Sequence, residues 1–231
     1  MFIFYIRTYQ IHLMINKVIN FSIYLLRYLT IINSKYNVSN KVNFGSKVAN
    51  NFFKKNLKQC NFYLEYGSGN STILANKLNK KFKSIETDKS FYRFMKTKKI
   101  KSIVYSDLGP TKYYSIPILP IFLLRKKIEK YAYQVEKFYN EYKIIPDFIL
   151  IDGRFRVFIA STIIKFCLKK KVLNTIIIID DFKSRKDYHV LNRFFKIKII
   201  GRFGVIKINK KLKLNKKKLE IIINKFKSNY F

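Results

Sequence analysis

One stretch of the sequence decides the fold class: Leu64-Glu65-Tyr66-Gly67-Ser68-Gly69-Asn70-Ser71-Thr72. A short apolar run ends there in a turn that contains two glycines. Gly67 and Gly69 allow the backbone to turn sharply and to approach a ligand closely. A dinucleotide-binding loop prefers Gly or Ala where Thr72 stands. The turn is a weak signal by itself, so the residues around it must decide which ligand it serves.

Short apolar runs alternate with segments of helical periodicity along most of the chain. The runs expected to form parallel strands are Phe62–Glu65, Ser84–Glu86, Ile103–Ser106, Phe148–Ile151 and Ile176–Ile179. The segments expected to be helical are Ser71–Lys80, Lys89–Lys98, Phe122–Tyr142, Val157–Lys169 and Tyr188–Phe195, preceded by a helix from Ser39 or Asn40 to Leu57 with a break near Gly45. This alternation predicts βαβ units and a parallel sheet that is covered on both faces.

The rhythm changes near the end of the chain. Lys196–Ile200 and Val205–Ile208 flank Gly201-Arg202-Phe203-Gly204, a pattern that predicts a tight antiparallel hairpin. The basic tail Lys210–Phe231 is expected to end in a short helix.

Acidic residues are scarce, and their positions form a pattern. Of the 13 Asp and Glu residues, six lie at or just past the carboxyl ends of the expected parallel strands: Glu65, Glu86, Asp107, Asp152, Asp180 and Asp181. Ligands of open α/β sheets bind in the crevice outside those strand ends. Helix capping is the alternative reason for such positions, and it suits Asp88. Capping does not account for Glu65 and Asp107, because a glycine turn follows the first and Leu-Gly-Pro follows the second.

This acidic edge indicates a ligand that is partly cationic and rich in hydroxyl groups, rather than a dinucleotide with a pyrophosphate. Glu86 follows the glycine turn by about twenty residues, which is the position from which an acid accepts ribose hydroxyl groups in dinucleotide folds.

The net charge of +35 has two possible origins. Only nine of the 48 cationic residues are Arg, and the chain is also rich in Asn, Ile, Phe and Tyr. AT-rich codons would produce this bias whatever the protein does, and selection for phosphate binding would be expected to raise the Arg content. A polyanion-binding surface for nucleic acid or membrane is the alternative, and it is not favoured.

Cysteine and histidine contribute little chemistry. Cys60 and Cys167 lack metal-site spacing, so free thiols in a reducing cytoplasm are expected. His12 and His189 are too few for a histidine metal site or a Ser-His-Asp triad.

Residues 1–38 are expected to form an apolar helical extension before a domain of residues 39–231. Arg7, Lys17 and Arg27 interrupt the apolar stretch, which is therefore too short to span a membrane. Packing on the domain or dimerisation is the first interpretation, and contact with a membrane surface is an alternative. A true start at Met14 is a further alternative.

The ordered motifs resemble those of class I methyltransferases. The motifs are Glu65-x-Gly67-x-Gly69, Glu86-x-Asp88, Asp107 and Asp152. More narrowly, Leu-Glu-Tyr-Gly-Ser-Gly-Asn-Ser-Thr, Asp-Leu-Gly-Pro-Thr, Ile-Asp-Gly-Arg-Phe-Arg-Val and Asp-Asp-Phe-x-x-Arg-x-x-Tyr resemble a little-characterised bacterial methyltransferase-like family, over roughly Val42 to Ile208. The resemblance implies a Rossmann-like α/β fold with helices on both faces of a seven-stranded, mostly parallel sheet in the order 3-2-1-4-5-7-6.

The resemblance also implies S-adenosylmethionine as cofactor. Gly67 to Gly69 would wrap its methionine end with Glu65 near its cationic groups, Glu86 would bind the ribose, and Asp107 with Leu108 the adenine. Ser68, Ser71 and Asp152 complete the expected cofactor site. This chain departs from the family in having Asp180-Asp181 where His-Asp is frequent, and Lys112-Tyr113-Tyr114 where Trp-Gly is frequent.

Methyl transfer requires alignment and, for a hydroxyl or amine acceptor, removal of a proton. Asp152 is the first candidate for the polar group at the reaction centre, with Asp181 and Arg154 as further catalytic candidates. Asp152, Asp180 and Asp181 are together an alternative site for Mg²⁺. In the competing interpretation Asp181 caps a helix and Asp180 bonds a backbone amide.

Arg154 and Arg156 stand out in a chain so poor in Arg. The two side chains either grip a carboxylate or phosphate on the substrate, or one of them pairs internally with Asp152 or Asp181. Arg185 and Tyr188 are expected to complete the substrate pocket or to anchor the following helix. Tyr113 and Tyr114 are further pocket candidates.

The expected function is transfer of a methyl group to oxygen or nitrogen of a small or sugar-like acceptor, by a cytoplasmic enzyme with membrane-peripheral attachment as an alternative. The alternative functions are an NAD-dependent oxidoreductase and a non-catalytic module that binds RNA or membrane. The terminal hairpin and the lack of a second mononucleotide-binding half argue against the oxidoreductase.

Overall fold

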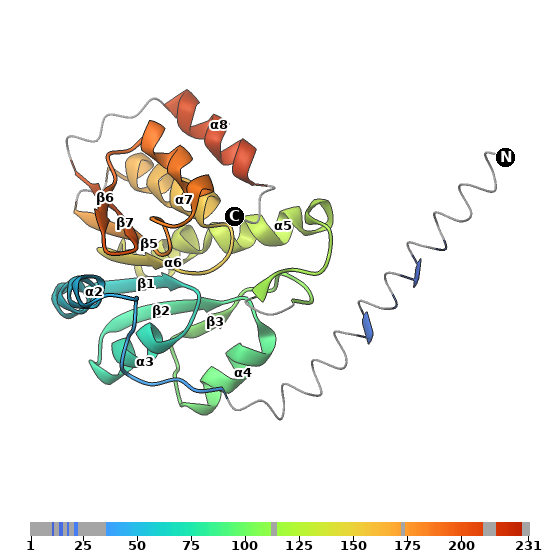
Figure 1. Ribbon diagram of the computed structural model, residues 1–231, viewed down its shortest axis with the longest axis horizontal. Coiled ribbons are helices and arrows are strands. Elements are labelled where there is room, and N and C mark those ends of the chain that lie inside the picture. Colours follow the sequence, from blue (N-terminus) through green and yellow to red (C-terminus); the bar gives the residue numbers. More distant parts are fainter. Residues whose placement is uncertain are drawn as a thin grey trace.

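A seven-stranded sheet forms the centre of the molecule in the computed structural model (Figure 1). The structure describes residues 11, 14, 15, 18, 21 and 22, and then 36–111, 115–171, 174–209 and 216–227. The strands are β1 (Phe62–Tyr66), β2 (Lys81–Glu86), β3 (Ile103–Tyr105), β4 (Phe148–Ile151), β5 (Thr175–Ile179), β6 (Lys198–Ile200) and β7 (Phe203–Ile208). Their order is β3-β2-β1-β4-β5-β7-β6, and β7 runs antiparallel to both of its neighbours. The predicted strand order and terminal hairpin are therefore confirmed.

Helices cover both faces of the sheet (Figure 1). On one face lie α2 (Lys47–Gln59), α3 (Asn70–Lys77) and α4 (Lys89–Thr97). On the other lie α5 (Ile121–Ala132), α6 (Gln134–Tyr142), α7 (Arg156–Lys169) and α8 (Lys216–Phe226). Side chains of a strand alternate between its two faces, so Ile149 and Ile151 enter one apolar cluster while Phe148 and Leu150 enter the other. This two-sided burial explains why β4 and β5 are continuous apolar runs.

The first helix begins later than predicted. Residues 36–45 are not helical, and α2 starts at Lys47. Ser46 caps it by accepting a hydrogen bond from the Ala49 amide, at 3.2 Å between Oγ and N. The candidate caps Ser39 and Asn40 do not begin a helix. The Ser39 amide instead donates a hydrogen bond to Oδ1 of Asn70, the first residue of α3.

The expected helix Phe122–Tyr142 is two helices, separated at Tyr133. The cause is the buried Tyr66 hydroxyl, which donates to the Ala132 carbonyl and accepts from the Val135 amide, both at 3.1 Å. A side chain inserted into the backbone ladder interrupts a helix in this way.

Two smaller differences concern the end of the domain. The segment Lys186–Arg193 is a 3₁₀ helix rather than the predicted α-helix Tyr188–Phe195. The hairpin turn comprises only Gly201 and Arg202, because Phe203 and Gly204 already belong to β7. Gly201 has a φ of +62°, and a Cβ there would lie 2.7 Å from Ser46 Oγ, so this glycine allows the turn to pack on α2.

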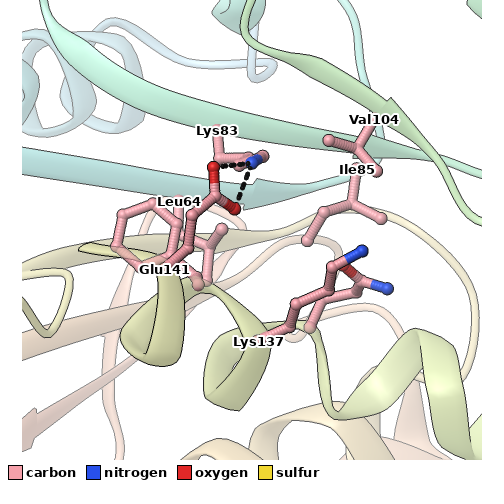
Figure 2. A pocket seen from close by; sticks show the side chains of 8 residues that line it. Leu64, Lys83, Ile85, Val104, Lys137 and Glu141 are labelled. Carbon is pink, nitrogen blue, oxygen red and sulfur yellow. Dashed lines mark hydrogen bonds and ion pairs between the residues drawn. The ribbon is translucent and has the colours of Figure 1, made fainter. Parts of the chain in front are cut away.

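Helix α6 closes the face of the sheet over β1, β2 and β3 (Figure 2). The gap that remains has a volume of about 10 Å³, so it holds at most a water molecule. Lys83 on β2 and Glu141 on α6 form an ion pair across it, at 2.8 Å between Nζ and Oε2. A ligand must therefore bind elsewhere on the sheet.

The predicted extension of residues 1–38 lies largely outside the described residues, and its boundary stays a prediction. Within the described part, no helix is long and apolar enough to cross a membrane. The short helix predicted in the tail is α8.

Candidate ligand cavity at the carboxyl edge of the sheet

A cavity of about 930 Å³ lies at the carboxyl ends of the parallel strands. The loops after β1, β2, β4 and β5 all contribute to its lining, as does the turn between β6 and β7. The lining residues from these segments are Gly67, Ser68, Glu86, Thr87, Asp88, Asp152, Gly153, Arg154, Arg156, Asp181, Arg185, Tyr188 and Arg202. This is the edge at which the scarce acidic residues were predicted to gather.

The first glycine of the turn is required by the close approach of two loops. Gly67 has a φ of +96°, and a Cβ there would lie 2.8 Å from the Gly153 amide nitrogen. A side chain at this position would therefore push the β1 loop away from the β4 loop. Gly69 has extended backbone, and no protein atom lies within 4 Å of the position of a Cβ. The protein itself therefore does not require a glycine at position 69.

Glu65 is fully buried behind the turn and does not line the cavity. Its carboxylate accepts hydrogen bonds from the hydroxyl groups of Tyr63, Ser71 and Thr72, the first two at 2.7 Å. Burial raises the pKa of Glu65, and these hydroxyl donors oppose the rise. The Thr72 hydroxyl also accepts from the Gly69 amide. Thr72 thus stabilises the turn through the Gly69 amide, and the buried Glu65 carboxylate holds Ser71 and Thr72 by hydrogen bonds.

Glu86 lines the cavity and joins two of its loops. Its Oε2 accepts from the Ser68 amide at 3.0 Å, and its Oε1 accepts from the amides of Thr87 and Asp88, both at 2.7 Å. The residue is only 4% exposed, and burial raises its pKa to about 7 despite these three donors. The Ser115 hydroxyl also donates to Oε1, at 3.5 Å. Among the described residues Oε2 has the Ser68 amide as its donor, so the second acceptor position of this oxygen remains for a ligand hydroxyl group. Asp88 caps α4, as predicted, by accepting from the amides of Ser90 and Phe91.

The structure does not bring Asp107 and Leu108 into the cavity lining. Asp107 is exposed and forms an ion pair with Lys127, at 2.5 Å between Oδ2 and Nζ, and Leu108 is buried in the core. Tyr36 and Phe91 line the cavity instead, with ring centroids 5.2 Å apart. Sequence reasoning missed both aromatic residues, because Tyr36 precedes the first strand and Phe91 lies in an ordinary amphipathic helix. The adenine role of Asp107 and Leu108 stays a prediction.

Arg156 pairs with other residues of the protein, which is one of the two roles that the sequence allows; the other is substrate binding. Its Nε donates to the Gly153 carbonyl at 2.9 Å, and its Nη1 contacts the Asp180 carbonyl at 2.6 Å and the Asp181 carboxylate at 3.3 Å. Its Nη2 contacts the carbonyl of Asp152 at 3.1 Å and the carboxylate of the same residue at 3.0 Å. A guanidinium has five N–H donors, and all five have acceptors here. The structure thus shows the internal pairing that was one of the two interpretations of Arg156, and a role in substrate binding stays a prediction.

Arg202 is a site residue that sequence reasoning missed. From the hairpin turn it forms a two-pronged ion pair with Asp180, with 2.5 Å between Nε and Oδ1, and it contacts Asp181 at 3.1 Å. Asp180 is fully buried, so this pairing supplies the counter-charge that a buried carboxylate needs. The signal available in the sequence was a scarce Arg in the hairpin that follows an acid pair.

The three carboxylates that were considered for Mg²⁺ do lie together, with ligand oxygens of Asp152, Asp180 and Asp181 within 4.8 Å of one another. Each carboxylate, however, is in contact with the guanidinium group of Arg156 or Arg202. A divalent cation would have to displace at least one of these groups, so the arrangement does not fit a magnesium site. Burial raises the pKa of Asp152, with Asp180 and Asp181 adding to the rise while Arg156 opposes it.

The remaining predicted substrate residues lie on the same side of the cavity. Arg154 is half-buried in the loop after β4, and Arg185 is exposed in the loop after β5. The Tyr188 ring is buried 5.9 Å from the Arg156 guanidinium carbon. His189 does not line the cavity and contacts the Phe182 carbonyl oxygen. Lys112, Tyr113 and Tyr114 lie outside the described residues.

Comparisons with known proteins give matches among solved structures only. No protein-family model matches the chain, and no curated protein is significantly similar in sequence. A methyltransferase-like protein from Silicibacter pomeroyi DSS-3 superposes with a TM-score of 0.64 at 23% identity, covering 82% of this chain and 99% of the other. This likeness establishes the fold, which is the Rossmann-like fold of class I methyltransferases.

Two further structures are more distant. The Podospora anserina methyltransferase PaMTH1, solved with S-adenosylhomocysteine, has a TM-score of 0.36 at 13% identity and covers 78% of this chain and 64% of its own. The MycE methyltransferase of mycinamycin biosynthesis, solved with Mg, S-adenosylhomocysteine and mycinamycin VI, has a TM-score of 0.35 at 10% identity, with coverages of 73% and 50%. Neither is similar enough to inform the site.

Proposed function

We propose that this protein is an S-adenosylmethionine-dependent methyltransferase. The observation that carries the proposal is Glu86, a buried carboxylate that faces the cavity and holds the Ser68 amide of the glycine turn. The carboxylate keeps an acceptor position for a ribose hydroxyl group beside the loop that would hold the methionine end. A volume of about 930 Å³ lies in the range of sites that hold a cofactor-sized ligand.

The described residues fit the chemical parts of this cofactor. Gly67 and Ser68 of the turn line the cavity, and the open space at the adjoining Gly69 leaves room for a ligand to approach the backbone. Phe91 and Tyr36 offer an aromatic surface near Glu86 for a purine ring. When bound, the cofactor would supply an electrophilic methyl group, while the protein would align the acceptor with it.

Asp152 is the proposed proton acceptor of the reaction. Its carboxylate lines the cavity with 37% of the side chain exposed, and Arg156 holds it through both an ion pair and a bond to its carbonyl. The pKa of this carboxyl group is raised by burial and by its acidic neighbours, which makes its ionised form a better proton acceptor. A hydroxyl or amine acceptor placed beside it would lose its proton to Asp152 as the methyl group is transferred.

Calorimetric titration with S-adenosylmethionine tests the proposal, with NADH as the comparison ligand. We expect micromolar binding of the methyl donor, lost in Glu86→Ala and retained in Glu141→Ala. Glu141 is a matched control because it is an ion-paired glutamate on the closed face of the sheet (Figure 2). Binding of NADH in place of the methyl donor would instead support the oxidoreductase alternative.

A further inference from the structure

The charges that line the cavity are arranged asymmetrically. Glu86 is the last residue of β2 and Asp88 lies in the loop after it, whereas Arg154 and Arg185 lie in the loops after β4 and β5. The β2 side therefore presents acids, whereas on the β4–β5 side the lining acids Asp152 and Asp181 are paired with Arg156 and Arg202, and Arg154 and Arg185 add further positive charge. The acidic side suits the hydroxyl-rich cofactor, which leaves the basic side for the acceptor.

The cationic residues that line the cavity differ in composition from those of the whole chain. Arg makes up nine of the 48 cationic residues of the chain, yet four Arg and, among the described residues, no Lys line the cavity. A codon bias toward Lys explains the overall charge but predicts the opposite composition here. The planar guanidinium fork binds carboxylate and phosphate groups through two parallel hydrogen bonds, which the ammonium group of Lys does not match.

Two of the four arginines form a framework on the β4–β5 side of the cavity. Arg156 uses all its N–H donors internally, and Arg202 is paired with Asp180 and Asp181. The same network also holds the loops that carry the other two. Arg154 lies between the paired residues Asp152 and Arg156, and the Arg185 amide donates to the Asp181 carbonyl at 3.1 Å. Arg154 and Arg185 are thus presented to the cavity from a fixed framework.

The side chains of Arg154 and Arg185 line the same cavity. Burial lowers the pKa of Arg154, and the charges of Arg156 and Arg185 lower it further. Like charges that face one cavity repel, and an anion between them removes this repulsion while gaining charge-assisted hydrogen bonds.

We propose that the methyl acceptor carries an anionic oxygen group, either carboxylate or phosphate, which Arg154 and Arg185 bind on the β4–β5 side of the cavity. Arg154 is two residues from Asp152, so an acceptor anchored there presents its nucleophile beside the proposed proton acceptor. The identification of the ligand as a methyl acceptor rests on the proposed function. The anion site itself does not, because it can be measured without the cofactor.

The test is titration of the full chain with inorganic phosphate and, separately, acetate, at constant ionic strength. Each titration is done with and without saturating S-adenosylhomocysteine. We expect saturable binding of at least one anion to the wild-type protein, weakened at least tenfold in Arg154→Ala and in Arg185→Ala. Lys at either position should restore part of the affinity, since the charge returns without the fork. Arg193→Ala is the matched control, because Arg193 is exposed outside the cavity lining.

The outcomes separate the two proposals. Equal anion affinity in the Arg154, Arg185 and Arg193 variants would mean diffuse binding to a basic protein and would overturn the anion site. Loss of S-adenosylhomocysteine affinity in Arg154→Ala or Arg185→Ala would overturn the acceptor assignment, because these arginines would then hold the carboxylate of the cofactor. Wild-type protein that binds the anion but not S-adenosylhomocysteine would refute the proposed function and leave the anion site in place. Preference for phosphate or for acetate identifies which anionic group the acceptor carries.

Discussion

Single residues determine whether the buried charges of this cavity are tolerated. Asp180 has no exposed surface, and its ion-pair partner Arg202 comes from a hairpin that follows it in the chain. We expect Arg202→Ala to lower the free energy of unfolding by about 3–5 kcal/mol, because it leaves a buried carboxylate without its counter-charge. Urea unfolding measures this difference. Arg193→Ala, which removes an exposed Arg, should change stability by no more than about 0.5 kcal/mol. Equal losses in the two variants would show that the pairing contributes nothing.

The two glycines of the turn should respond differently to the same substitution. Gly67→Ala places a methyl group against the backbone of the β4 loop, in a conformation with φ of +96°. We expect it to cost about 1–3 kcal/mol of stability and to abolish binding of the methyl donor. Gly69→Ala meets open space and should leave stability unchanged to within about 0.5 kcal/mol. Thermal unfolding of both variants provides the comparison, and unchanged affinity in Gly67→Ala would rule out the proposed role of the loop.

The protonation state of Glu86 predicts a pH dependence of cofactor binding. Burial raises the pKa of this group to about 7, so a proton occupies it in the free protein at lower pH. A ribose hydroxyl donates to the ionised form, so the association constant should rise by about tenfold per pH unit below that pKa and level off above it. Calorimetry across this range measures the dependence, which Glu86→Gln should remove. A flat profile in the wild-type protein would show that the carboxylate does not bind the ligand in its ionised form.

Folding stability should depend on Glu86 in the opposite direction. The pKa of this group in the folded state lies above the ordinary value of 4.5 for an exposed glutamate, so the folded state binds the proton more tightly. The resulting stabilisation is complete below the unfolded pKa and is lost as the pH rises through about 7.

At the scale of elements, the sequence predicts the central strands well because their burial is two-sided. A short, continuous apolar run between turn signals, such as Phe148–Ile151, is typical of a strand that is buried on both faces. The break between α5 and α6 was unpredictable, because its cause is Tyr66, which is distant in the chain. The late start of α2 has a similar origin, because the segment before it is hydrogen-bonded to α3. The Ser39 amide donates to the Asn70 side chain, and that side chain donates to the Lys41 carbonyl.

Removal of the Tyr66 hydroxyl tests this account of the helix break. Tyr66→Phe leaves the Val135 amide and the Ala132 carbonyl without their partner in a buried position. We expect a loss of about 1–3 kcal/mol in urea unfolding, which is the cost of leaving buried backbone groups unsatisfied. Tyr142→Phe on α6 is the control, because its side chain is 42% exposed. A Tyr66→Phe protein as stable as this control would contradict the assigned cause.

The candidate site was predictable in part, for a reason that concerns chain distance. Glu86, Asp152 and Asp181 lie at or just past the ends of their strands, so the rule for ligand sites in open α/β sheets locates them. Arg202, Tyr36 and the internal pairing of Arg156 depend on which segments meet across the sheet edge. A pattern within one segment does not contain that information.

At the scale of the whole molecule, the net charge of +35 predicts weak, non-specific attraction to polyanions. We expect binding to single-stranded RNA at low salt that falls steeply with salt and is undetectable at about 0.15 M. Fluorescence anisotropy with a labelled RNA of mixed sequence measures this. Retention of tight binding at that salt concentration would favour the nucleic-acid alternative.

The packing of the hairpin has a consequence for synthesis of the protein on the ribosome. β7 pairs with β5, and the turn before β7 packs on α2. The hairpin near the end of the domain is therefore needed to cover elements that are made earlier. The ribosome adds roughly 5–20 residues per second, so β7, which ends 29 residues after β5, is complete roughly 1–6 seconds after β5. During that delay the isoleucines of β5 present an unpaired strand edge, which other nascent chains can join. The yield of folded protein should accordingly depend on translation speed and on chaperones that cover this edge.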